Sequence, residues 1–96
     1  MATTITQSNS VTVITLGLTG IATKVTPPRF TRFLWLQFRS AIGGVAYQGT
    51  DGAAIDASYF NLAADQLVEL QHDSDRPFFL AGASDGVEAV IVCREW

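Results

Sequence analysis

The sequence has very few of the residues that build catalytic, metal or disulfide sites. It contains one cysteine, Cys93, and one histidine, His72, among 96 residues. A single cysteine cannot form an internal disulfide, and a zinc site needs several converging Cys or His ligands. We interpret Cys93 as a small buried hydrophobe and His72 as a solvated residue of a polar loop. The sequence therefore predicts neither a metal ion nor a cofactor.

Charge is also scarce. Charged residues make up 16% of the chain, and the net charge is −3, whereas about 25% of an ordinary domain is charged. Nucleic-acid binding depends on Lys and Arg that neutralise phosphates, so we expect no nucleic-acid partner. No apolar run approaches the roughly 20 residues that span a bilayer, and the first ten residues lack the basic start and apolar core of a signal peptide. We expect synthesis in a cytoplasm. We expect no association with a membrane.

Sequence motifs of the common enzyme classes are missing. There is no GxGxxG, P-loop or GxSxG pattern, and no nucleophile is paired with a base in a recognisable spacing. Residues 73–75 (DSD) begin like a calcium loop but lack its glycine and closing glutamate. These two acids, together with Asp51, Asp56 and Asp85, fall in predicted loops, where they keep the surface soluble. We predict that the protein is not an enzyme.

Short apolar runs separated by turn residues are what the sequence does have. Runs rich in Val, Ile, Thr and aromatic residues recur about every 8–12 residues, which is typical of a β-sandwich or barrel. We predict an all-β fold, an antiparallel β-sandwich or jelly-roll-like barrel of about seven or eight short strands. The clearest strands are expected at residues 10–18, 21–26, 30–39, 45–48, 78–81 and 87–94. One domain over residues 10–96 follows a polar, Thr-rich segment, 1–9, that we interpret as a flexible N-terminal arm.

Two turns and one ambiguous segment lie between these strands. Gly43-Gly44 and Asp51-Gly52 are predicted turns. Residues 59–71 fit a helical apolar stripe, but the alternation around Val68 and Leu70 favours two strands joined by a turn at 63–65. We therefore interpret residues 59–71 as strands.

The strand at 30–39 is apolar on both faces. Leu34, Leu36 and Phe38 share one face with Phe30 at core spacing, whereas Phe33 and Trp35 point to the other face. Aromatics interleaved with Arg can also bind single-stranded nucleic acid, but core packing explains this pattern better.

The surplus of apolar residues over charged ones indicates a surface that other subunits cover, so we expect an oligomer. The candidate partner-contact residues are Phe33, Trp35, Phe79 and Trp96. For each of them, packing in the protein's own core explains the apolar side chain equally well or better.

The order of elements resembles the small jelly-roll-like β-sandwich proteins of tailed-bacteriophage virions, which decorate or cement capsids. The similarity covers most of residues 29–95 and is carried by RFLWLQFRS, the AYQGTDG turn, SYFNLAADQLVEL and PFFLAGASDGVEAVIVCRE. Those proteins usually carry Pro or Gly in the middle of the segment that corresponds to residues 62–67. This chain has Ala64 and Asp65 at that point.

That resemblance implies a structural protein that binds the major capsid protein or other virion proteins and stabilises the capsid as an oligomer, commonly a homotrimer. It also implies location in the virion after assembly in the host cytoplasm, with residues 1–9 tied to a neighbour by strand addition. Two alternatives remain open. One is a tail or collar adaptor of the same particle. The other is a lectin-like module in which Trp35, Tyr47, Tyr59 or Trp96 stacks on a sugar ring.

Overall fold

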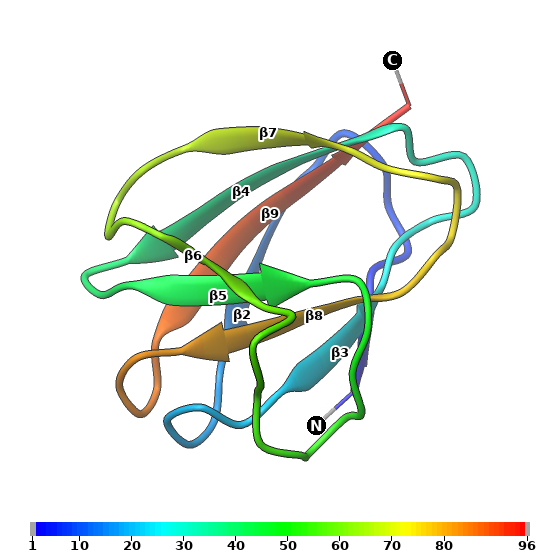
Figure 1. The fold of residues 1–96 in the computed structure, drawn as a ribbon. Helices are drawn as coiled ribbons and strands as arrows, with labels where there is room; N and C mark the ends of the chain where they lie inside the picture. Colours follow the sequence, from blue (N-terminus) through cyan, green and yellow to red (C-terminus); the bar gives the residue numbers. More distant parts are fainter. Residues whose placement is uncertain (1, 96) are drawn as a thin grey trace.

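A computed structural model describes residues 2–95, which form two packed β-sheets and contain no helix (Figure 1). The fold is the predicted all-β sandwich. The strands are β1 Thr3–Thr4, β2 Val11–Thr15, β3 Thr23–Thr26, β4 Phe33–Arg39, β5 Gly43–Ala46, β6 Phe60–Leu62, β7 Val68–Gln71, β8 Phe78–Gly82 and β9 Glu88–Arg94.

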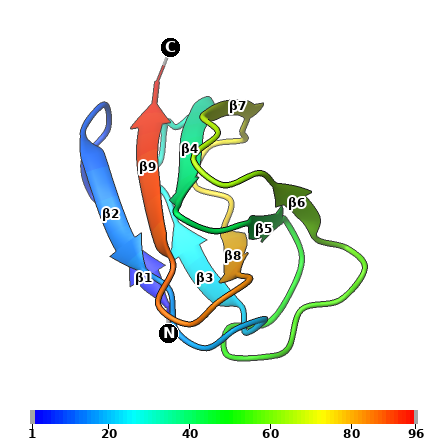
Figure 2. The ribbon, with the colours of Figure 1, turned by 90° about the vertical axis from the view of Figure 1, so that its left-hand side faces the viewer.

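The two sheets face each other across the core (Figure 2). Sheet A has the strand order β1-β3-β8-β5-β6, and sheet B has the order β2-β9-β4-β7. All neighbouring strands are antiparallel except β1, which runs parallel to β3. Across residues 2–95, the structure has one strand more than the predicted seven or eight. The additional strand is β1, which lies inside the segment that was expected to be a flexible arm.

The core forms between the inward faces of the sheets. Leu34, Leu36 and Phe38 of β4 are fully buried, as their alternation predicted, and Phe78 and Leu80 of β8 are fully buried in the same apolar cluster. Alternate residues of a strand point to opposite faces, so burying these side chains leaves Phe33 and Trp35 on the outer side of sheet B.

Residues 3–5 pack against the domain itself. Thr3 and Thr4 pair with Val25 and Thr26 of β3, and the N–H of Ile5 donates to the carbonyl of Thr26 at 2.9 Å. The Ile5 side chain is 4% exposed and belongs to the core cluster. This arrangement differs from the expected flexible arm because one apolar residue in the polar segment reaches the core.

Gly43-Gly44 is part of strand β5 and not the predicted turn. The chain reverses at residues 40–42 instead, where Ser40 adopts a positive φ of 67° and its N–H donates to Asp65 Oδ1 at 2.9 Å. Gly43 lies against the ring of Phe38: a Cβ at this position would be 2.2 Å from ring carbons. The glycine is therefore required for close packing.

Residues 59–71 form the two predicted strands, β6 and β7, and not a helix. The turn between them contains Asp65, which has a positive φ of 63° and donates its N–H to the carbonyl of Phe38 at 2.7 Å. The predicted Asp51-Gly52 turn is present, with φ of 79° at Gly52, but it sits within the longer connection 47–59 between β5 and β6.

Candidate binding surface

The outward side of sheet B carries a continuous apolar area, which we call the outer face. Register places its residues in rows across four strands: Val11, Val92, Trp35 and Glu69 form one row, and Val13, Val90 and Gln37 form the next. Val11 and Val13 are 67% and 44% exposed. The outer face consists of Val11, Val13, Phe33, Trp35, Val90 and Val92.

Trp35 is held in place where the apolar area of this surface borders β7. Its indole Nε1–H donates to Glu69 Oε2 at 2.9 Å, and the guanidinium carbon of Arg94 lies 4.4 Å from the ring centroid. Arg94 is opposite Phe33 on the neighbouring strand, so register itself brings the guanidinium over the indole. A tryptophan fixed in this way loses little conformational freedom on binding, which favours a role as an interface anchor.

Charged groups lie at the margins of the outer face. Arg39 and Glu88 form an ion pair at 3.7 Å at one end, and Arg94 and Glu69 flank Trp35 at the other. An apolar area that contains a Trp and has charged groups at its margins is typical of a protein–protein interface. The sequence predicted Phe33 and Trp35 here but not Val11 and Val13, which only the register of β2 with β9 places on this face.

The other two candidate contact residues do not join this surface. Phe79 is 7% exposed on the outward side of sheet A, where the connection 47–59 covers it: a Cβ at Gly49 would lie 3.4 Å from its ring. The sequence could not reveal this cover because it depends on where a loop folds back. Trp96 lies outside the described residues.

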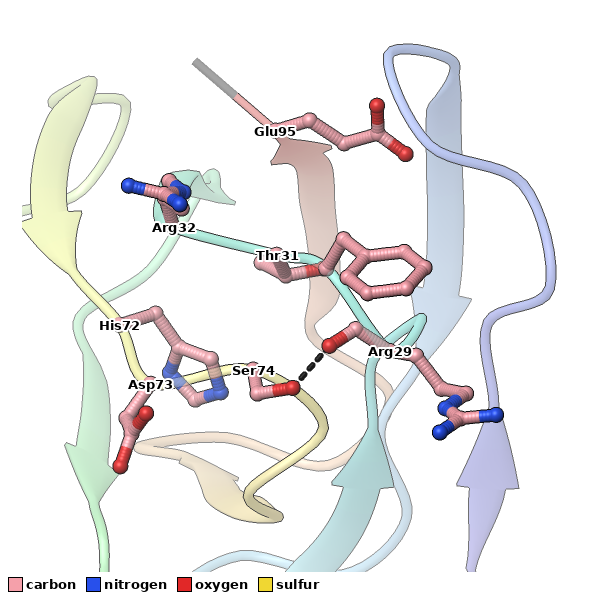
Figure 3. A pocket seen from close by; sticks show the side chains of 8 residues that line it. Arg29, Thr31, Arg32, His72, Asp73, Ser74 and Glu95 are labelled. Atoms are coloured by element: carbon pink, nitrogen blue, oxygen red, sulfur yellow. Dashed lines mark hydrogen bonds between the residues drawn. The ribbon is translucent and has the colours of Figure 1, made fainter.

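A second candidate site is an open cavity of about 530 Å³ at one end of the sandwich. Figure 3 shows that its lining comes from the turn before β4, the loop after β7 and the end of β9. The Ser74 hydroxyl donates to the carbonyl of Arg29 across the two loops. The lining residues are Arg29, Phe30, Thr31, Arg32, His72, Asp73, Ser74 and Glu95.

Phe30 stands in this cavity instead of the core. Its side chain is 69% exposed, and the guanidinium carbon of Arg29 is 5.9 Å from its ring centroid. Strand β4 begins at Phe33, and residues 29–30 form a turn after Pro27-Pro28, so the core spacing read from the sequence does not extend back to Phe30.

His72 is half-buried and packed, contrary to its interpretation as a solvated loop residue. Its ring contacts Tyr47 and Phe78, with centroids 5.6 and 5.7 Å apart, and Nε2 lies 2.7 Å from the carbonyl of Arg76. Burial lowers the pKa of His72 below its usual value, although the Arg76 carbonyl opposes this shift. Burial therefore favours the neutral imidazole.

Cys93 is buried in the core cluster as predicted. Burial raises the pKa of its thiol to about 11, and the neighbouring Thr31 side chain opposes the shift. The thiol is therefore protonated and unreactive at neutral pH.

Aromatic rings that could stack on a sugar are largely engaged within the protein. Arg94 occupies one face of Trp35, and the guanidinium carbon of Arg76 lies 5.1 Å from the centroid of Tyr47. Tyr59 is half-buried beside Gly49. Phe30 is more exposed than any of these three rings.

Residues 2–95 hold no group of three or more His, Cys, Asp or Glu side chains placed to share a metal ion. Across the same residues, no helix has the length and apolar character to cross a membrane. Comparison with protein families, curated proteins and solved structures finds no match to this chain.

Proposed function

We propose that the protein is a non-enzymatic structural component of a phage particle that binds the capsid surface as an oligomer. The outer face, with Trp35 held by Glu69 and Arg94, is the observation that carries this proposal. It offers contiguous apolar area with a charged rim, which suits a protein partner better than a small molecule.

The order of the strands adds support. Strands β2 to β9 pair as 2-9-4-7 in one sheet and 3-8-5-6 in the other, so the chain passes between the sheets at nearly every connection. This is the eight-stranded order of jelly rolls, a fold used by viral capsid proteins and also by lectins. The fold is therefore compatible with the proposal, while the outer face favours binding to protein.

Removing the Trp35 indole from the outer face is expected to weaken capsid binding. The prediction for Trp35→Ala is about 10- to 100-fold weaker association, because a Trp that anchors an interface typically contributes about 2 kcal/mol or more. Co-sedimentation of the purified protein with capsids that lack it, across a concentration series, measures this change. The capsids are those of the phage that encodes this sequence.

Phe60→Ala is the matched control. Phe60 is an exposed aromatic, 43% accessible, on β6 of the opposite sheet. It should leave capsid binding unchanged. If the unmodified protein shows no saturable binding to capsids, the proposal is overturned. If Trp35→Ala and Phe60→Ala lose capsid binding equally, the outer face is not the surface that binds the capsid.

A carbohydrate-binding role is the second candidate, and the cavity around Phe30 favours it. An exposed ring beside guanidinium and carboxylate groups can stack on a sugar and hydrogen-bond its hydroxyls. If the cavity has this role, a glycan array will show specific binding that Phe30→Ala removes and Trp35→Ala retains. An array without signal rejects this candidate.

A further inference from the structure

Three of the four sheet edges are short or carry charge. Sheet A ends in β1, of two residues, and β6, of three; sheet B ends on one side in β7, which contains Glu69. The fourth edge is β2, with the sequence VTVIT. It has five residues, all of them β-branched, and contains neither a charged residue nor a proline. Proteins usually blunt exposed edges with charge, proline or shortness, because an open edge pairs with other strands.

The backbone groups on the free side of β2 can be identified from the ladder. Leu16 N–H donates to the carbonyl of Val87 at 2.8 Å, in the same register as the β2–β9 pairing. In an antiparallel pair, hydrogen-bonded positions alternate. Thr12 and Ile14 therefore bond to β9, and the N–H and C=O groups of Val11, Val13 and Thr15 point away from it. Strand β2 is the last strand on its side of sheet B (Figure 2), so these groups face the open edge.

We propose that β2 pairs with β2 of a second copy, antiparallel and around a two-fold axis at Val13. This register places Val13 opposite Val13 and Val11 opposite Thr15. Among antiparallel registers, it is the one in which the outward N–H and C=O groups of Val11, Val13 and Thr15 all form hydrogen bonds with the second strand. Two sheets B then join into one sheet of eight strands. This inference rests on the proposed function, because it joins two outer faces into a single surface for one capsid.

A second copy is the occupant that the sequence favours. Lys24 is the first charged residue in the sequence, so β2 itself can pair with β2 of a second copy without placing like charges opposite each other across the new strand pair. The exposed side chains of Val11 and Val13 gain apolar neighbours in the same step. A two-fold contact is self-complementary and closed, so it does not propagate into a fibre.

The dimer presents two Trp35 side chains to the capsid. Each copy contributes one Trp35 to the joined outer faces, and two linked sites bind a repeating surface more tightly than either site alone. The pairing thereby explains why an edge left open to strand addition occurs next to the outer face.

Cysteine cross-linking of the full-length protein tests the register. In Val13→Cys the two sulfur-bearing positions should be about 5.5 Å apart between Cα atoms, within disulfide range, so oxidation should yield a covalent dimer. Val11→Cys lies on the same edge, but the two copies of position 11 are offset by four residues, or roughly 13 Å. It should stay uncross-linked, and the native Cys93 is buried and protonated.

Sedimentation velocity measures the pairing without a cross-link. The unmodified protein should be a dimer, and Val13→Lys, which sets two ammonium groups opposite each other, should weaken dimerisation at least tenfold. Leu67→Lys is the control, because Leu67 is 63% exposed beside the other edge of sheet B. Circular dichroism establishes that each variant is folded.

The two proposals fail separately. A monomeric or trimeric unmodified protein, or equal cross-linking at positions 11 and 13, would overturn the β2 pairing. If such a protein still binds capsids through Trp35, the proposed function stands. A dimer that binds no capsid overturns the function and leaves the pairing intact.

Discussion

Replacing Gly43 with alanine is expected to destabilise the fold by about 3 kcal/mol or more, a loss at the upper end of overpacking substitutions. The added Cβ would lie 2.2 Å from carbons of the Phe38 ring. Phe38 is fully buried and packed against the core, so its ring has nowhere to move without disturbing other side chains. A small domain is stable by only about 5–15 kcal/mol, so this change removes a large share of its stability.

Gly44→Ala is the matched control on the same strand. Its Cβ would meet no atom closer than 3.4 Å, the distance to Asn61 Oδ1 and Tyr59 Cδ2. We expect a change within about 1 kcal/mol, as for an ordinary substitution that creates no clash. Urea unfolding measures both free energies, and equal values for the two variants would contradict the packing argument.

A double variant separates the steric cause from strand propensity. Phe38→Leu alone should destabilise the protein because it leaves a gap in the core. Combined with Gly43→Ala, the smaller side chain makes room for the added Cβ, so the two changes should cost less together than the sum of each alone. Strictly additive costs would show that the two positions do not clash.

Periodicity in the sequence was enough to predict the strands and the core face of β4. Leu34, Leu36 and Phe38 alternate with residues of different character, and alternation is a local property of the chain. The same reasoning placed Phe33 and Trp35 on the opposite face. It also separated β6 from β7, because Val68 and Leu70 alternate with Glu69 and Gln71.

Features that depend on distant segments could not be predicted in this way. Gly43 is a typical turn residue, and only the position of the Phe38 ring explains why it sits inside a strand. Phe79 is covered by the connection 47–59, and the place where that connection folds back is not a local property of the sequence. The outer-face residues Val11 and Val13 required the β2–β9 register, which no local pattern supplies.

The N-terminal segment gives the second large effect. Ile5→Ala is expected to destabilise the domain by about 2–5 kcal/mol, the usual range for truncating a buried isoleucine. Ile5 is 4% exposed within the core cluster, and its N–H extends the β1–β3 pairing at 2.9 Å from the carbonyl of Thr26. Gln7→Ala, two residues later on an exposed position, should change stability by less than about 0.5 kcal/mol.

The same pair of variants decides whether residues 1–9 serve their own domain or a neighbour. If Ile5 belongs to its own core, Ile5→Ala lowers the urea midpoint at every protein concentration, and capsid binding by the folded fraction is unchanged. If the segment instead docks on a neighbouring subunit, the variant keeps its midpoint in dilute solution and loses association. Because Ile5 fills one core position, the segment cannot do both at once, and unfolding curves at two protein concentrations distinguish the outcomes.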